Sequence, residues 1–417
     1  MNIFKKADIL IPKNADYKKW SVVACDQYTS EPEYWNGVEK VVGEAPSALK
    51  IVFPEIYLKD EPEKRIDKIN KTMEEYLNSG LFEELSSSLV LVERTQRDGR
   101  TRTGIIGMVD LEAYSFTKGD GTPIRATEGT VLERIPPRVK IRENASLELP
   151  HILLLIDDEK KTVIESVKAK KDSLKKVYDF DLLMDSGHLT GFRIEDADEI
   201  FEALENLGDV ALFKEKYDTD SDNVLLFAVG DGNHSLATAK TCWDNLKVSL
   251  TESEKQTHPA RFALVEVMNI HDEALEFEPI HRVVFGVNPE KMIEEFLEFY
   301  PDSSLADNGG QHIKYVYGNV EGDLYVKNSS SNLAVGSLQN FIDYYIKETT
   351  AEVDYIHGED VVRKLSENEG NIGFLLSGME KNELFQTIIK DGALPRKTFS
   401  MGEAWDKRFY LEAKKIK

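Results

Sequence analysis

Residues 230–235 combine the residue types of a phosphate-binding loop. The segment reads GDGNHS; an apolar run at residues 223–229 predicts a strand before it, and the residues after it favour a helix. Backbone N–H groups at such a junction, together with the positive end of the helix dipole, form an anion site. The predicted phosphate ligands are Gly230, Gly232, Asn233 and Ser235.

Asp231 and His234 carry the reactive side chains of this loop. The Asp231 carboxylate can hold Mg²⁺ or accept a proton from a substrate hydroxyl, and the His234 imidazole can donate to phosphate oxygens. We therefore predict both residues as catalytic and Asp231 as the metal ligand. The alternative is a plain turn in which Asn233 or Ser235 is the N-cap of the helix.

A basic cluster at residues 125–142 is a local exception in an acidic chain. The segment reads RATEGTVLERIPPRVKIR, in which arginines recur every four positions from Arg134. Because Pro136 and Pro137 disfavour a regular helix, we expect the arginines to line a loop. Arginine suits bidentate contacts with phosphate, so the predicted ligands are Arg125, Arg134 and Arg138. The alternative is surface pairing of these arginines with neighbouring glutamates.

Two further segments contain residues that can act on a substrate. The segment VVACDQYTSEPEYW offers Asp26 and Glu31 as a general base or metal ligand, although Ser30 can instead cap a helix here. In EPIHRVV, His281 can titrate or bind phosphate beside Arg282, although a structural role is the alternative for a lone histidine before a strand.

The elements that must position these residues follow from apolar periodicity. Two β-type runs at residues 89–94 and 103–111 predict a hairpin around the turn dipeptide Asp98-Gly99. Other expected strands cover residues 152–156, 260–269, 283–285, 324–326 and 333–335, and expected helices cover residues 66–77, 163–178, 196–207 and 289–299. Since 417 residues exceed the usual size of one core, we expect two units, 1–288 and 289–417.

Composition excludes several classes of protein. The formal net charge of −23 disfavours nucleic-acid binding, because a polyanion would be repelled over most of the surface. No segment is apolar enough to span a bilayer, and the N-terminal residues do not form a secretory signal. Two cysteines are too few for a disulfide framework. We therefore expect a cytoplasmic protein that binds no membrane.

Several motifs together resemble the bacterial family called domain of unknown function 1015. They are ALKIVFPEIYL, RTQRDGRTRTGIIGMVDLEAY, GDGNHSLATAK and EPIHRVV, and the resemblance covers nearly the whole chain. That family looks related to the ParB and sulfiredoxin superfamily, which includes free-serine kinases with an Asp-Gly-His-His-Arg motif that holds nucleotide phosphates. Asp231, Gly232 and His234 match this motif, whereas Asn233 replaces the first histidine and Ser235 replaces the arginine.

The resemblance implies an α+β fold, with a ParB/sulfiredoxin-like core carrying large insertions and a smaller C-terminal α/β unit. It implies Asp26 or Glu31 as the general base, and Arg134, Arg138 or Arg282 as a source of the charge missing at Ser235. The expected function is a Mg²⁺-dependent small-molecule kinase that transfers a phosphoryl group from ATP or ADP to a hydroxyl metabolite, with free L-serine as the leading acceptor. The alternatives are a non-catalytic nucleotide-responsive binding protein and a phosphomonoester hydrolase that acts on phosphoserine-like substrates.

Overall fold

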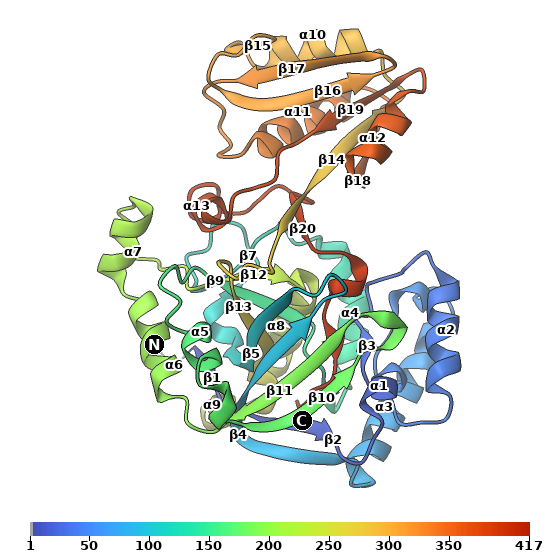
Figure 1. Cartoon of the computed structure of the whole chain (residues 1–417), viewed down its shortest axis with the longest axis vertical. Helices are drawn as coiled ribbons and strands as arrows, with labels where there is room; N and C mark the ends of the chain where they lie inside the picture. Colours follow the sequence, from blue (N-terminus) through green and yellow to red (C-terminus); the bar gives the residue numbers. More distant parts are fainter. Residues whose placement is uncertain (1–2) are drawn as a thin grey trace. The chain divides into compact units, whose positions relative to one another are not determined.

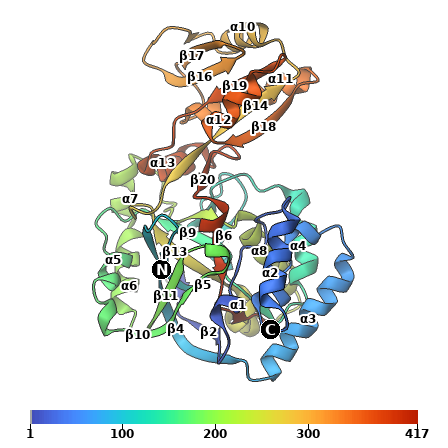
Figure 2. The ribbon, with the colours of Figure 1, turned by 45° about the vertical axis from the view of Figure 1, so that its right-hand side comes forward.

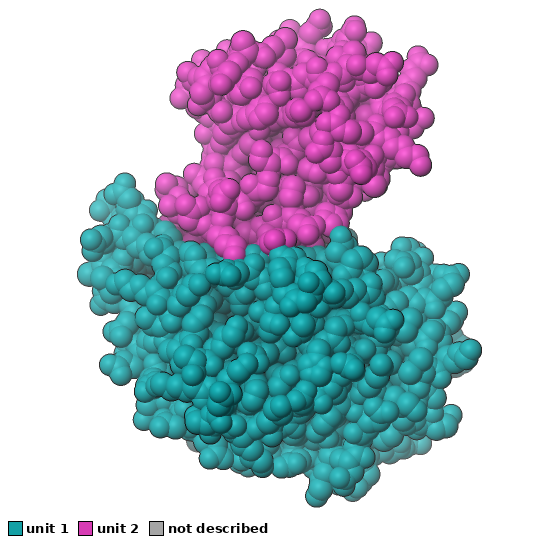
Figure 3. Space-filling view, viewed as in Figure 1, with its two compact units in different colours: residues 1–275, 402–417 teal, residues 276–401 magenta. Residues whose placement is uncertain are grey.

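A computed structural model describes residues 3–417, which form two compact units (Figure 1). Unit 1 contains residues 1–275 and 402–417, and unit 2 contains residues 276–401 (Figure 3). The predicted division at residue 288 differs from this one in two respects. Strand β14 (Phe277–Phe285) belongs to unit 2 because it pairs with strands of that unit, and the C-terminal residues return to unit 1 because they pair with its strands.

Unit 1 is built on one large mixed sheet. Its strands run in the order β10-β11-β4-β5-β13-β9-β12-β7-β6, with β1 and β2 paired at the side to β5 and β4. The bounds are β1 (Phe4–Lys5), β2 (Ala7–Pro12), β4 (Phe82–Thr95), β5 (Thr101–Asp110), β6 (Tyr114–Ser115), β7 (Ile124–Ala126), β9 (Ile152–Ile156), β10 (Lys175–Asp181), β11 (His188–Ile194), β12 (Phe227–Asp231) and β13 (Phe262–Asn269).

The large sheet separates two apolar cores. Successive strand residues face opposite sides, and in β4 Leu89 and Leu91 join one core while Val90 and Val92 join the other. Helices on the two faces complete these cores (Figure 2). The bounds of the unit 1 helices are α1 (Tyr17–Trp20), α2 (Pro32–Val42), α3 (Pro62–Asn78), α4 (Ile135–Arg142), α5 (Ile164–Lys168), α6 (Asp198–Leu207), α7 (Val210–Tyr217), α8 (Asn233–Lys247) and α9 (Glu252–Thr257).

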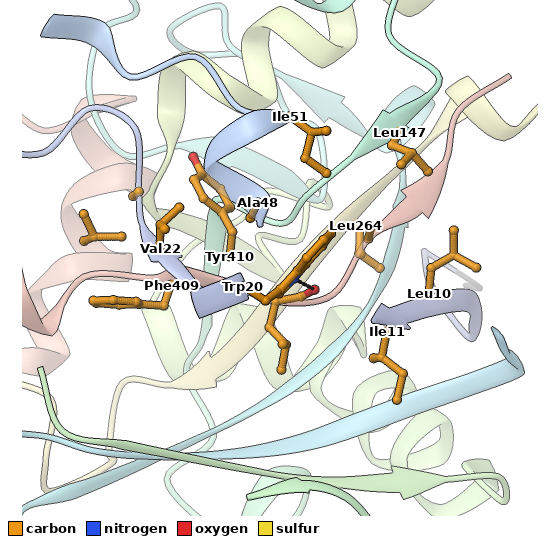
Figure 4. Packing of buried hydrophobic residues seen from close by; sticks show 14 of the residues in the cluster. Leu10, Ile11, Trp20, Val22, Ala48, Ile51, Leu147, Leu264, Phe409 and Tyr410 are labelled. Carbon is orange, nitrogen blue, oxygen red and sulfur yellow. Dashed lines mark hydrogen bonds between the residues drawn. The ribbon is translucent and has the colours of Figure 1, made fainter. Parts of the chain in front are cut away.

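The C-terminal segment is an integral part of unit 1. Strand β21 (Phe409–Tyr410) pairs with β3 (Val22–Val23), and β22 (Lys414–Lys415) pairs with β8 (Leu147–Glu148). Figure 4 shows the side chains of Trp20, Phe409 and Tyr410 in the core. The Trp20 indole N–H donates to the Leu411 carbonyl at 2.9 Å, which ties the two ends of the chain together.

Unit 2 is an antiparallel sheet with helices. The strand order is β15-β17-β16-β19-β14-β18, with β20 paired to β14, and each of these pairs is antiparallel. The predicted α/β arrangement for this unit is therefore wrong. The bounds are β15 (Ser303–Ser304), β16 (Gln311–Tyr317), β17 (Val320–Val326), β18 (Glu352–His357), β19 (Asn371–Leu375), β20 (Phe399–Met401), α10 (Pro289–Phe299), α11 (Ala334–Glu348), α12 (Glu359–Ser366) and α13 (Lys381–Asp391).

Three local predictions fail, two of them for identifiable reasons. The arginine segment is helix α4, because Pro136 and Pro137 lie in its first turn, where no backbone N–H is needed. The expected helix at residues 163–178 stops at α5, and the chain then forms β10, which pairs with β11. The expected strand at residues 333–335 is the start of α11. Proline position decides the first case, and pairing of β10 with β11 decides the second.

The mixed α+β class and the predicted hairpin of β4 and β5 are confirmed. Within residues 3–417, the structure contains no helix that is both long and apolar enough to cross a bilayer.

Candidate functional site

The loop between β12 and α8 is shaped by one glycine. Gly232 has φ +81° at the N-cap position of α8, a conformation that favours glycine. A Cβ atom there would lie 3.0 Å from Ile152 Cα and 3.2 Å from the His151 carbonyl oxygen. The glycine therefore lets strand β12 turn directly into a helix against β9, and the N–H groups of the first turn lie at the positive end of the helix dipole.

Asn233 does not cap the helix, which corrects the predicted turn alternative. Its side-chain oxygen accepts from the Thr127 N–H, and its side-chain N–H₂ donates to the Thr127 hydroxyl, both at 3.2 Å. Thr127 in turn donates to the Val229 carbonyl at 2.6 Å. The Asn233 side chain thus fixes the segment after β7 against the loop, which leaves its backbone as the part available to an anion.

Asp231 lies beside a lysine from the C-terminal segment. Its Oδ1 accepts from the Gly232 N–H at 2.8 Å, and its Oδ2 lies 3.4 Å from Lys407 Nζ. Both side chains are largely buried, with exposed fractions of 24% for Asp231 and 14% for Lys407. Lys407 was missed by the sequence prediction, because nothing near it in the sequence relates it to the loop at residue 231.

Asp26 forms an ion pair with His151, another residue that the sequence prediction missed. His151 Nε2 lies 3.4 Å from Asp26 Oδ1, and Gln27 donates to the same oxygen at 2.9 Å. The other ring nitrogen of His151 lies 2.9 Å from the Tyr410 hydroxyl, which also accepts from the Cys25 N–H at 3.2 Å. Tyr410 therefore holds the imidazole in an orientation that faces Asp26.

The two groups of this pair keep each other charged. Burial raises the pKa of Asp26. The charge and hydrogen bond of His151, together with Gln27 and Lys407, outweigh this effect, so the pKa lies well below its usual value. Burial lowers the pKa of His151, but Asp26 raises it well above its usual value. We infer an ionised carboxylate beside an imidazolium at neutral pH.

The ligand atoms of Asp26, His151 and Asp231 lie within 4.8 Å of one another. Oxygen ligands suit Mg²⁺, so the Asp231 and Asp26 carboxylates fit this ion. The charged imidazole of His151 is not a metal ligand in this state, because coordination requires a free nitrogen lone pair. The donor set therefore accommodates a hard divalent cation through its carboxylates.

A cavity of about 170 Å³ opens beside this cluster. Its polar lining includes Cys25, His151 and Tyr410, together with Ser235 and Thr238 from the first turns of α8. The rest of the wall is mostly apolar, with residues from α3, α4 and the segment around residue 51, and Arg138 lies among them. The cavity thus ends at the same imidazole that pairs with Asp26.

The structure separates the predicted arginines. Arg138 lines the cavity and forms an ion pair with Glu55. Arg125 donates to the Thr122 carbonyl at 2.8 Å and to the Asn223 carbonyl at 2.6 Å, so it braces the backbone. Arg134 is exposed. Of the three, only Arg138 reaches the wall of this cavity.

The remaining predicted residues also take different places. Glu31 is exposed at the start of α2, whereas Asp26 belongs to the cluster, so the geometry favours Asp26 among the two carboxylates. Gly230 lies within β12, and His234 lies in the first turn of α8, where its carbonyl accepts from Thr238 at 2.7 Å.

His281 and Arg282 belong to strand β14 of unit 2. Arg282 is fully buried and donates to the carbonyls of Lys397 and Arg396 at 3.0 and 3.1 Å. His281 accepts from the Leu376 N–H at 3.1 Å. The His281 contact matches the structural alternative for that residue, and Arg282 braces the backbone after α13.

A family model described as "Protein of unknown function (DUF1015)" matches residues 9–388. No curated protein matches the chain. Among solved structures, a free serine kinase mutant in complex with AMP is similar at a TM-score of 0.40 and 10% identity, over 74% of this chain and 91% of that one. SbnI with a C-terminal truncation from Staphylococcus aureus is similar at a TM-score of 0.37 and 10% identity, over 71% and 83%. A conserved hypothetical protein from Pyrococcus furiosus gives 0.35 and 11%, over 73% and 90%.

Proposed function

The chain belongs to the DUF1015 family, and we propose that unit 1 is a phosphotransferase that moves a phosphoryl group from ATP or ADP to a hydroxyl group of a small metabolite. The observation that carries this proposal is one cluster in which Asp231, Lys407 and the start of α8 adjoin the Asp26–His151 pair. The cluster combines an anion site at the start of α8, the cation of Lys407, and the Asp26 carboxylate, which can bind the acceptor hydroxyl. Free L-serine is the acceptor that the family resemblance suggests.

The phosphate-binding side of the site consists of backbone and one lysine. The first N–H groups of α8 meet phosphate oxygens, and Lys407 supplies the positive charge that Ser235 does not. Asp231 is the ligand we assign to Mg²⁺, with Asp26 within reach of the same ion. When bound, Mg²⁺ would offset the charge of the nucleotide phosphates.

The acceptor side of the site is the cavity that ends at His151. Phosphoryl transfer forms a bond between the acceptor oxygen and phosphorus, breaks the bond from phosphorus to the bridging oxygen, and leaves the charge on the departing nucleotide. The hydroxyl proton passes to Asp26. Because the transition state is loose, Asp26 needs little basicity; its main task is to orient the hydroxyl, and the pair with His151 keeps it ionised for that task.

The lowered pKa of Asp26 also favours a second candidate, a nucleotide-responsive binding protein without turnover. A carboxylate that resists protonation accepts a hydrogen bond well and removes a proton poorly. The two candidates share the nucleotide site and differ in whether phosphate moves.

A ³¹P NMR turnover experiment separates them. The purified protein is incubated with Mg²⁺, ATP or ADP, and a panel of hydroxyl metabolites headed by L-serine, with Asp231→Ala and Asp26→Asn as controls. We expect a new phosphomonoester signal that disappears in both variants. Nucleotide binding with an unchanged spectrum across the panel would favour the binding protein. Release of phosphate from added O-phospho-L-serine, in a sample without nucleotide, would indicate a phosphomonoester hydrolase.

A further inference from the structure

The wall of the cavity beside His151 contains an ion pair between Arg138 and Glu55. Arg138 of α4 bonds to Glu55 of the 3-10 helix Glu55–Tyr57, and the two side chains are 19% and 21% exposed. The second guanidinium nitrogen of Arg138 donates to the Arg134 carbonyl at 2.9 Å, which fixes where the arginine stands. A fixed cation and an anion thus lie together on a wall that is otherwise mostly apolar.

The second ion pair of the cavity wall, between Arg142 and Glu148, belongs to a larger network of contacts. Arg142 lies 2.5 Å from Glu148, but Glu148 also meets Lys414 at 3.2 Å and accepts from the Leu264 N–H at 2.8 Å. Glu148 is nearly inaccessible and is tied to three elements, so it stabilises the fold. Unlike the Arg142–Glu148 pair, the Arg138–Glu55 pair can exchange its partners for a ligand without breaking such a network.

From this arrangement we infer that Arg138 and Glu55 bind the charged head group of a zwitterionic α-amino acid, with the carboxylate at Arg138 and the ammonium group at Glu55. The inference rests on the proposed function, because it makes this amino acid the hydroxyl acceptor. Arg138 and Glu55 then determine the specificity of the cavity. The substrate class is a hydroxy amino acid with a free amino group and a free carboxyl group.

The charge balance of the cavity selects for this class. A bound zwitterion replaces the Arg138–Glu55 ion pair with two new ones, Arg138 with the carboxylate and Glu55 with the ammonium group. No charge is then left unpaired in the poorly solvated cavity. A hydroxy acid would pair with Arg138 and leave the Glu55 carboxylate without a partner. An amino alcohol would pair with Glu55 and leave the Arg138 guanidinium without a partner. The other charged side chains of the wall are already paired, Arg142 with Glu148 and His151 with Asp26, so they compensate for neither loss.

The size of the cavity extends the class beyond L-serine. A cavity of ~150 Å³ holds a benzene ring, and this one has about 170 Å³. That volume leaves room for a methyl group on the hydroxyl-bearing carbon. L-threonine therefore fits the same head-group contacts, with its hydroxyl directed towards His151 and Asp26.

The test is direct ligand binding to the full chain, measured by calorimetry in the presence of Mg²⁺ and a non-hydrolysable nucleotide. The ligands are L-serine, L-threonine, D-glycerate and ethanolamine, and the proteins are wild type, Arg138→Gln, Glu55→Gln and the exchanged pair Arg138→Glu with Glu55→Arg. The control is Glu199→Gln, which breaks an exposed pair with Lys170 at 2.6 Å.

We expect the two amino acids to bind the wild type and the control, and each single variant to bind them at least ~30-fold more weakly, as for the loss of one partner of a charge pair. D-glycerate and ethanolamine should bind poorly to the wild type. The exchanged pair restores the ion pair and hence the fold, which a matching thermal midpoint checks, yet it should not restore binding.

Equal binding of L-serine by wild type and both single variants would overturn the inference, as would tight binding of D-glycerate or ethanolamine. Because binding is measured without transfer, the result is separate from the proposed function. Amino-acid binding that depends on Arg138 and Glu55 supports the head-group site even where no phosphomonoester forms, and phosphorylation of an uncharged alcohol supports the kinase while it refutes this site.

Discussion

Lys407→Met removes the cation that we assign to the transferring phosphate and keeps an unbranched apolar stem. Lys407 Nζ lies 3.4 Å from Asp231 Oδ2, and two unit charges at that distance interact by about 5 kcal/mol at an effective dielectric constant of ~20. Part of this is offset by the desolvation of the pair and by solvent, because the two side chains are 14% and 24% exposed.

A phosphoryl group that develops charge beside Lys407 loses a comparable interaction in the variant. Removal of one preorganised electrostatic contact typically costs about 2.7–4 kcal/mol of transition-state stabilisation. We therefore expect kcat/KM for the acceptor to fall by about 10²- to 10³-fold. Lys407→Arg keeps the charge, so its loss should be smaller than that of Lys407→Met.

The assay is steady-state formation of the phosphorylated acceptor, with the thermal midpoint measured in parallel. The matched control is Lys415→Met in the same C-terminal segment, because Lys415 lies 3.5 Å from Glu84 but is 52% exposed. A pair this exposed contributes at most about 1 kcal/mol to stability. Unchanged kcat and KM in a folded Lys407→Met protein would refute the assignment of Lys407 to the phosphate.

Four other substitutions have defined outcomes. Asp231→Ala and His234→Ala should each lower phosphoryl transfer by ~10²-fold or more, measured by ³¹P NMR. Gly232→Ala should lower stability by about 1–3 kcal/mol in urea titrations, because φ is +81° and the new Cβ would lie 3.0 Å from Ile152 Cα. Burial raises the pKa of Glu148, but Lys414 and Arg142 lower it below its usual 4.5. A lowered pKa gives stability that is present above pH 4.5 and lost as the pH falls through the native pKa. Glu148→Gln should therefore cost about 3–5 kcal/mol at neutral pH, and the difference from wild type should shrink in acid.

The sequence predicts the local parts of the fold because their causes are local. The β4–β5 hairpin follows from two alternating runs around Asp98-Gly99, and α6 follows from its apolar spacing. The Asp231 loop follows from a glycine between a strand and a helix. In each case the residues that decide the structure are neighbours in the chain.

The parts that the sequence does not predict depend on contacts between distant segments. Lys407, Tyr410 and His151 reach the cluster only because β21 pairs with β3 and β9 pairs with β12. No pattern around Lys407 distinguishes it from an exposed lysine. The predicted replacement for the missing arginine was Arg134, Arg138 or Arg282, and the cation beside Asp231 is instead a lysine from the end of the chain.

The position of Lys407 is itself fixed by burial of its neighbour. Arg408 is nearly inaccessible and lies 2.5 Å from both Glu266 and Glu412, and Glu266 is 1% exposed. Removal of Arg408 would leave a buried carboxylate without its partner, which is far more costly than the loss of a surface contact. A fragment cut at the predicted boundary, residues 1–288, would lack Arg408 together with Lys407 and Tyr410. Such a fragment therefore tests neither the kinase nor the amino-acid site, and the experiments above require the full chain.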